Sequence, residues 1–187
     1  MASDEGTKSF RLVTMSEENR HLFNCFPSEY DVEETLIPYN EGGFYMYEFE
    51  KLERPSVRTY PDDAYEERQD GVVFFALSGE QCVGQIHAYR WWNGMLQVSD
   101  LRVRRDHRGR GIARALMDAV TAYARERGYQ ALRLETQASN ANACRFYAHY
   151  GFWLMGVDLA IYNTTQSRGD TALYWYYSLV PMEQWQS

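Results

Sequence analysis

The chain has 187 residues, of which 45% are hydrophobic and 24% charged, and its formal net charge is −7 at pH 7. This composition predicts one globular domain over residues 1–187, with no apolar run near the ~20 residues that cross a membrane and no signal peptide. The negative charge disfavours nucleic acid as a partner, and three scattered cysteines predict a reducing, cytoplasmic setting without a bound metal.

The first half of the chain starts with a predicted strand, Phe10–Thr14, followed by a predicted helix, Met15–Asn24. Phe44–Glu50 alternates apolar and polar residues, which is typical of a half-buried strand. The polar stretch Leu52–Gly71 contains two prolines and is predicted to be a long loop of the kind that often carries function.

The second half is richer in regular elements. Three strands are predicted to form an antiparallel meander: Val72–Ser78, Cys82–Trp92 and Met95–Val103. Helices and strands then alternate: helix Gly109–Arg127, strand Ala131–Thr136, helix Asn140–Tyr150, strand Phe152–Leu159 and strand Thr171–Leu179. The pattern predicts an α/β fold with a mixed, mostly antiparallel sheet flanked by helices on both faces.

The connection after Val103 carries the most specific signal. The run Arg108-Gly109-Arg110-Gly111-Ile112-Ala113 places two glycines at the mouth of a helix. Glycine lets the backbone approach a ligand closely, and the free N–H groups and the helix dipole favour an anion there. The run therefore predicts a pyrophosphate cradle for a phosphorylated cofactor.

Charge is distributed unevenly along the chain. Between Ser28 and Asp70 there are thirteen acidic and four basic residues, whereas Arg102 to Arg114 holds six arginines and one acid. This asymmetry predicts two ligands of opposite sign, and the alternative is an acidic surface that is simply solvated.

Two motifs in the same order resemble the signature of the GNAT acetyltransferases. The first is Arg108-x-x-Gly111-x-Ala113, and the second is Asn140-x-x-Ala143-x-x-Phe146-Tyr147-x-x-Tyr150-Gly151-Phe152. A single glycine-rich loop recurs by chance, but two motifs separated by a helix and a strand are specific. The resemblance implies a GNAT-like fold and the transfer of an acetyl group from acetyl-CoA.

Further segments resemble the streptothricin acetyltransferases within this family, over roughly Tyr60 to Tyr174. They include Tyr60-Pro61-Asp62-Asp63, Trp92-Asn93, Asp100-Leu-Arg-Val, Leu134-Glu135, Gly156-Val-Asp158 and Ala160-Ile-Tyr162. The likeness implies an acceptor amine on a polycationic antibiotic, and hence antibiotic resistance. One departure is Ser99, which stands where an acidic pair is often found.

The resemblance also implies how acetyl-CoA is held. Backbone N–H groups of Arg108, Gly109, Arg110, Gly111, Ile112 and Ala113 would bind the pyrophosphate, and the two arginine side chains would add charge-assisted hydrogen bonds. The strand residues Leu101 and Val103 would pair with the pantetheine arm. Asn140 would contact the same arm, cap the helix that follows it, or do both.

Catalysis by such an enzyme needs a general acid for the leaving thiolate and a base for the amine. Tyr147 is the expected acid. Glu135, Asp100 and Asp158 are candidates for the base, and each is equally suited to orienting a cationic acceptor. Aromatic residues that could line the acceptor site through cation–π contacts are Trp91, Trp92, Tyr45, Tyr47 and Tyr162.

Two alternatives stay open at the level of sequence. One is a GNAT enzyme that acts on another polyamine, an aminoglycoside or a protein amine, and the other is a non-catalytic acyl-CoA-binding domain. The presence of Tyr147 argues against the second. The aromatic run Leu173–Tyr177 also suggests a strand that could pack across a homodimer.

Overall fold

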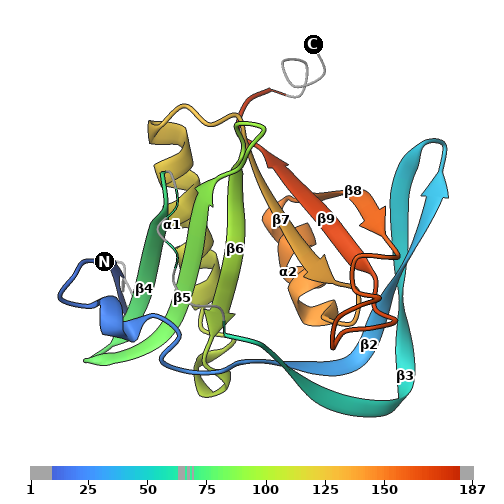
Figure 1. Ribbon diagram of the computed structural model, residues 1–187, viewed down its shortest axis with the longest axis horizontal. Coiled ribbons are helices and arrows are strands. Elements are labelled where there is room, and N and C mark those ends of the chain that lie inside the picture. Colours follow the sequence, from blue (N-terminus) through green and yellow to red (C-terminus); the bar gives the residue numbers. More distant parts are fainter. Residues whose placement is uncertain (1–9, 63–65, 67, 69, 182–187) are drawn as a thin grey trace, which may run out of the picture.

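A seven-stranded sheet forms the centre of the computed structural model, which describes residues 10–62, 66, 68 and 70–181 (Figure 1). In spatial order the strands are β1 (Arg11–Thr14), β4 (Val72–Ser78), β5 (Gln81–Arg90), β6 (Leu96–Val103), β7 (Ala131–Gln137), β9 (Ala172–Ser178) and β8 (Trp153–Asp158). Every neighbouring pair is antiparallel except β6 and β7, which are parallel. The predicted mixed, mostly antiparallel sheet and the β4–β5–β6 meander are therefore confirmed.

Two α-helices, α1 (Ile112–Glu126) and α2 (Ala141–Tyr150), lie behind the sheet in the view of Figure 1. They share one hydrophobic core with the sheet, in which Leu116 of α1 and Trp175 of β9 are fully buried. The opposite face of β4 and β5 is covered instead by the N-terminal segment around Phe26. The expectation of helices on both faces thus holds for one face, while the described residues on the other face form only a short 3-10 turn, η1 (Arg20–Leu22).

The predicted helix Met15–Asn24 is wrong. The backbone N–H of Met15 donates to Val73 O at 2.9 Å, which continues the strand pairing beyond β1. The Asn19 side chain then accepts from Ser16 N–H at 2.7 Å and donates to Thr14 O at 3.1 Å. Such side-chain bonds compete with helical ones and favour a turn, so only η1 is helical.

A long hairpin is formed by β2 (Ser28–Glu41) and β3 (Phe44–Tyr60), and β3 takes up the first nine residues of the predicted loop Leu52–Gly71. The strands are joined by Gly42 and Gly43, both with positive φ, which suits a tight two-residue turn. Pro55 lies beside the register shift that follows Val32, where a missing N–H interrupts no regular ladder. The hairpin runs below the sheet and along its right-hand side in Figure 1.

Strand β9 lies between β7 and β8, so it is not an edge of the sheet. Its central residue Trp175 is fully buried, and Tyr47 of β3 and Tyr147 of α2 contact its ring system edge-on or at a tilt. Both edges of this strand are thus paired within the chain, and packing of the run Leu173–Tyr177 across a homodimer remains a prediction.

Two negative findings apply to the described residues. No helix among them is long and apolar enough to cross a membrane. No three His, Cys, Asp or Glu side chains among them are grouped so as to hold a metal ion.

Candidate active site

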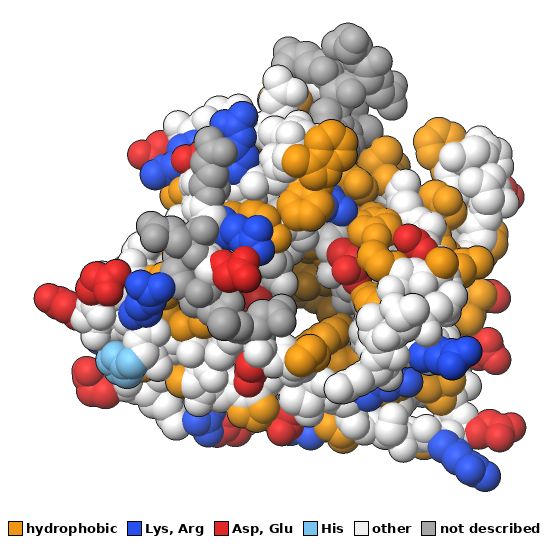
Figure 2. All heavy atoms as spheres, viewed as in Figure 1, with side chains coloured by type: hydrophobic (Ala, Val, Ile, Leu, Met, Phe, Trp, Pro, Cys, Tyr) orange, Lys and Arg blue, Asp and Glu red, His pale blue; other side chains and the backbone are white. Residues whose placement is uncertain are grey.

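The parallel strands β6 and β7 separate soon after they begin to pair. Their pairing covers only Leu96–Val98 and Leu132–Leu134, after which the two strands diverge (Figure 1). Beyond this point Leu101 and Val103 remain paired with β5 on one side only. Figure 2 shows a hollow near the middle of this face of the molecule, with acidic side chains beside it. The opening between β6 and β7 is called the split below.

At the lower end of β6 the chain turns into the mouth of α1. Gly109 and Gly111 have φ values of 74° and 77°, which side chains other than glycine rarely adopt. No side chain among the described residues caps α1, so the N–H groups of its first turn are available to a ligand. A pocket of about 320 Å³ opens here, lined by Val103, His107, Arg108, Gly109, Gly111, Ile112, Ala113, Arg114, Phe146, His149 and Tyr150. This geometry fits the pyrophosphate that the sequence predicts.

Gly84 of β5 sets how closely α1 approaches the sheet. A β-carbon at this position would lie 2.7 Å from Ile112 Cγ2 and 3.0 Å from Leu116 Cδ1, closer than van der Waals contact allows. Glycine at this position therefore lets the mouth of α1 rest directly on β5, next to the end of β6.

The guanidinium groups of Arg108 and Arg110 hold the loop in shape. Arg108 donates through Nε to Val103 O at 3.2 Å and through Nη2 to the carbonyl of Glu29 in β2. Arg110 donates to Asp106 O at 2.9 Å. Both guanidinium groups are thus engaged with carbonyl oxygens of the chain, and binding of a pyrophosphate by the backbone N–H groups or by either arginine remains a prediction.

Tyr147 lies at the back of the split, on the face of α2 that packs against the sheet. Its ring contacts Phe152 and Trp175, with centroids 5.7 and 6.4 Å away. Burial raises the pKa of its phenol, and the nearby carboxyls Asp100 and Glu135 raise it further. The structure therefore brings the predicted acid and two predicted bases together, and it keeps the phenol protonated.

Asn140 begins α2 as its N-cap, as predicted. Its Oδ1 accepts from Ala143 N–H at 3.2 Å, and its Nδ2 donates to the Tyr60 hydroxyl at 3.3 Å. The amide group thus joins the start of α2 to the end of β3, and its contact with pantetheine remains a prediction.

Glu135 is the only residue of β7 that is not buried. Its Oε1 accepts a hydrogen bond from the Tyr162 hydroxyl, while no described residue donates to its other oxygen. Burial raises the pKa of the Glu135 carboxyl, although the Tyr162 hydrogen bond and Arg133 act in the opposite direction. A partly exposed carboxylate with one free oxygen and a raised pKa is suited to accepting a proton.

Asp100 has a different environment. Arg102 Nε donates to both of its oxygens, at 3.1 and 3.0 Å, and Gln85 Nε2 donates to Oδ2 at 2.7 Å. The same guanidinium bridges to Asp62 at 2.6 Å. Asp100 therefore neutralises a buried arginine, and its hydrogen-bonding capacity is largely used within the protein.

The structure does not bring Asp158 and Trp92 into the split in the same way. Asp158 ends β8, where its Oδ1 accepts from Ala160 N–H at 2.7 Å and Ile161 N–H at 3.0 Å. Trp92 is 86% exposed in the β5–β6 turn, beyond the paired ends of β6 and β7. A role of either side chain in acceptor binding remains a prediction.

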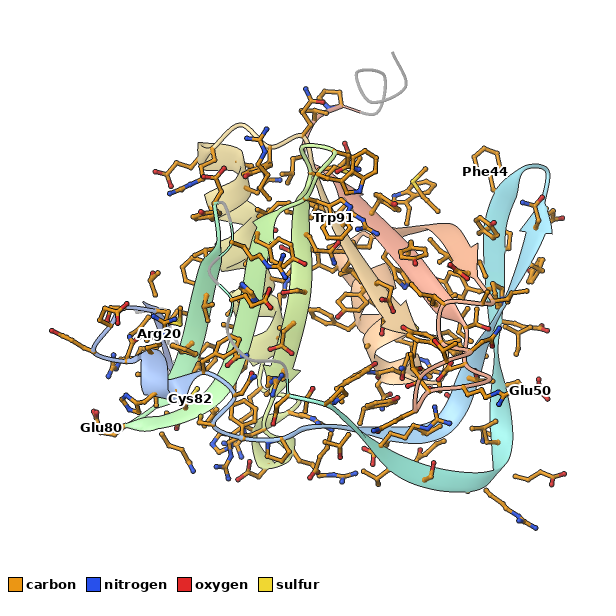
Figure 3. The ribbon with its side chains drawn as sticks, viewed as in Figure 1. Arg20, Phe44, Glu50, Glu80, Cys82 and Trp91 are labelled. Atoms are coloured by element: carbon orange, nitrogen blue, oxygen red, sulfur yellow. The ribbon has the colours of Figure 1, made fainter. Side chains whose placement is uncertain are left out.

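Several of the aromatic residues expected to line the acceptor site pack against other side chains of this chain. The guanidinium of Arg133 lies 4.8 Å from the ring centroid of Trp91 and 5.4 Å from that of Tyr174. Figure 3 labels Trp91, which lies over the paired ends of β6 and β7. The Trp91 ring is thus stacked on a cation of this chain, and Tyr45 and Tyr47 pack against the core.

Sequence reasoning named Tyr45 and Tyr47 of β3 but missed the contacts that Tyr30 of β2 and Tyr60 of β3 make in this region. The rings of Tyr30 and Tyr60 stack with centroids 4.7 Å apart, and the Tyr30 hydroxyl donates to Gln137 Oε1. The Gly42-Gly43 pair and the apolar residues at alternating positions in Ser28–Glu41 would have indicated the hairpin. Acidic residues between the apolar ones obscure that pattern.

Comparison with known proteins agrees with this geometry. The model of the acetyltransferase (GNAT) family matches residues 29–152. Streptothricin acetyltransferase A of Bacillus subtilis (strain 168) is 31% identical over 170 residues, which are 89% of this chain and 98% of the relative. Streptothricin acetyltransferase of Streptomyces lavendulae is 37% identical over 130 residues, which cover 64% and 69% of the two chains.

Solved structures show the same fold. The crystal structure of a nourseothricin acetyltransferase superposes with a TM-score of 0.80 at 29% identity and covers 92% of this chain and 99% of its own. An acetyl coenzyme A complex of a Bacillus anthracis protein assigned as a streptothricin acetyltransferase has a TM-score of 0.84 at 22% identity, covering 91% and 99%. This chain thus belongs to the GNAT acetyltransferase family and is an acetyl-CoA-dependent N-acetyltransferase.

Proposed function

We propose that the acceptor is an amine of a streptothricin-type cationic antibiotic, so that acetylation confers resistance. The observation that carries this proposal is Glu135, a partly exposed carboxylate in the neighbourhood of Tyr147 whose second oxygen receives no hydrogen bond from a described residue. A carboxylate of this kind attracts a cationic amine and can bind it directly. The names of the relatives, which match nearly the full chain, support the same acceptor class.

In this proposal Glu135 is the base rather than Asp100 or Asp158, because both oxygens of Asp100 accept hydrogen bonds from Arg102, and Asp158 is not among the carboxyls that raise the pKa of Tyr147. Glu135 accepts one proton from the acceptor ammonium and later releases it to solvent. The nitrogen lone pair forms the bond to the acetyl carbon as the carbon–sulfur bond breaks. Tyr147 protonates the departing sulfur and recovers its proton from the nitrogen, so one proton is released in all.

The donor is held by the chain's own backbone. The N–H groups of residues 108–113 bind the pyrophosphate at the mouth of α1, and the free edge of β6 at Leu101 and Val103 pairs with the pantetheine amides. This assignment rests on the positive φ values of Gly109 and Gly111, the uncapped helix and the unpaired edge. We expect the reaction to take place in the cytoplasm, a reducing compartment in which free cysteines are common.

Replacing Gly111 with alanine is expected to raise KM for acetyl-CoA about five- to tenfold, with little change in kcat. A side chain at φ 77° costs about 1–2 kcal/mol, so the loop relaxes and its N–H groups lose their alignment. Gly43→Ala is the matched control, because Gly43 also has a positive φ but lies at the tip of the hairpin, beside Phe44 in Figure 3. Steady-state kinetics of both variants check the prediction, and equal KM values would contradict it.

The acceptor is tested by thiol release from acetyl-CoA with a panel of cations. Streptothricin should give the highest kcat/KM, and mass spectrometry should show one added acetyl group. Spermidine, an aminoglycoside and a lysine-containing peptide are the comparison acceptors. Turnover of one of these without turnover of streptothricin would overturn the acceptor class but leave the acetyltransferase assignment intact.

A further inference from the structure

The loop between β8 and β9, residues 159–171, is hydrogen-bonded to β7 at two points and to the turn after β7 at a third. The Tyr162 hydroxyl donates to Glu135, Gln137 Nε2 donates to Ser167 Oγ at 2.6 Å, and the Ser139 hydroxyl donates to Asp170. Glu135 and Gln137 are two apart in β7, so their side chains lie on the same face, and Ser139 lies in the turn that follows the strand. The loop therefore runs along β7, and the first of these hydrogen bonds is made to the candidate base, Glu135.

The loop holds Tyr162 firmly from its own side. The Tyr162 carbonyl accepts from the backbone N–H and the hydroxyl of Thr165, both at 2.9 Å. The turn that precedes it is closed by the Asp158 carboxylate, which caps two N–H groups, and by a bond from Asn163 N–H to Ala160 O at 2.9 Å. The Tyr162 hydroxyl thus reaches Glu135 from a fixed backbone.

We propose that Tyr162 is a positioning residue for Glu135: its hydroxyl occupies Oε1 and fixes the carboxylate so that Oε2 receives the proton of the acceptor amine. This inference rests on the proposed role of Glu135 as the base. A partly exposed glutamate on a strand would otherwise move among several rotamers, and a base must lie within hydrogen-bond reach of the proton it takes.

The phenol also affects when Glu135 is charged. The charged and titratable groups around Glu135 come from four elements besides the Tyr162 loop: Arg133 of β7, Asp158 of β8, Tyr174 of β9 and Tyr147 of α2, together with Asp170 of the loop. Arg133 and the Tyr162 hydrogen bond lower the pKa of Glu135, while burial and the two aspartates raise it. Loss of the Tyr162 hydroxyl should therefore move this pKa upward.

The test is Tyr162→Phe, which removes the hydroxyl and keeps the ring. We expect kcat to fall about tenfold with an unchanged KM for acetyl-CoA, as for loss of one hydrogen bond to a charged group. The acid limb of the kcat/KM profile should move to higher pH. Tyr129→Phe is the matched control, since the Tyr129 hydroxyl donates to Asp70 at 2.9 Å, away from the split, and this variant should behave as the parent protein.

A second variant separates positioning from simple ordering of the loop. Ser167→Ala removes the neighbouring tie to Gln137 and leaves the bond between Tyr162 and Glu135 in place. If Ser167→Ala reproduces both the fall in kcat and the shift of the acid limb, the positioning role is overturned. Unchanged kinetics of Tyr162→Phe together with an inactive Glu135→Gln would also overturn it, whereas full activity of Glu135→Gln would instead refute the proposed base.

Discussion

Tyr147→Phe should lower kcat by roughly 10²-fold, the effect typical of a lost general acid, while leaving KM for acetyl-CoA nearly unchanged. Burial raises the pKa of the Tyr147 phenol, so it remains protonated throughout the working range and can give its proton to the departing sulfur. Phenylalanine keeps the ring contacts with Phe152 and Trp175, and the core around α2 should survive intact.

The measurement is thiol release at saturating acceptor, with thermal unfolding followed on the same samples. Tyr123→Phe is a suitable control, because the Tyr123 hydroxyl donates to Asp70 O at 3.1 Å and takes no part in the split. A Tyr147→Phe enzyme with parental kcat would show that solvent protonates the sulfur and would remove Tyr147 from the mechanism. A fall in kcat shared by both variants would indicate a general effect on the fold.

The elements that local patterns could predict are those whose contacts are also local. The helical spacing of Ile112, Leu116 and Val120 and the glycines before them specify α1 and its mouth, and all three of these apolar residues are buried. The Asn140 cap likewise marks the start of α2. These segments carry their own start signals and periodicity, so one short stretch of sequence suffices to recognise them.

The hairpin of β2 and β3 and the roles of the carboxylates could not be predicted in this way. Glu135 meets Tyr162 across 27 residues of sequence, and Arg102 meets Asp62 across 40. Pattern reasoning treats Asp100 and Glu135 as equivalent acids near the end of a strand. Only the tertiary structure shows that the buried guanidinium of Arg102 donates to both oxygens of Asp100. The Tyr162 phenol, by contrast, donates to one oxygen of Glu135 and leaves the other free.

This difference between the two carboxylates gives the split two chemically distinct sides. On the β6 side, Asp100 and Asp62 share Arg102, which ties the start of the loop after β3 to the sheet. Such a buried pair costs stability when one partner is removed, so its mutation would report on folding as much as on chemistry. On the β7 side, the negative charge of Glu135 is available to an acceptor, which makes it the informative position to change.

Glu135→Gln should lower kcat/KM for the acceptor by roughly 10³-fold at neutral pH, because glutamine keeps the shape and the Tyr162 contact but cannot accept the proton. In the parent enzyme, activity should fall as the pH drops through the pKa of Glu135, which burial raises above the ordinary carboxyl value. In the variant this limb should disappear. The residual rate should then rise tenfold for each pH unit up to the pKa of the acceptor amine, since only amine already free of its proton can react.

Glu80→Gln makes the same change of charge in the β4–β5 turn, where the Glu80 side chain is 98% exposed, and serves as the control (Figure 3). Its pH profile should match that of the parent enzyme. An acid limb that persists unchanged in Glu135→Gln would show that another group takes the proton, and Asp100 would then be the group to examine. A variant that loses its rate and whose remaining activity rises tenfold per pH unit up to the pKa of the acceptor amine, while Glu80→Gln keeps the parental rate and profile, would identify Glu135 as the base that frees the acceptor amine for attack.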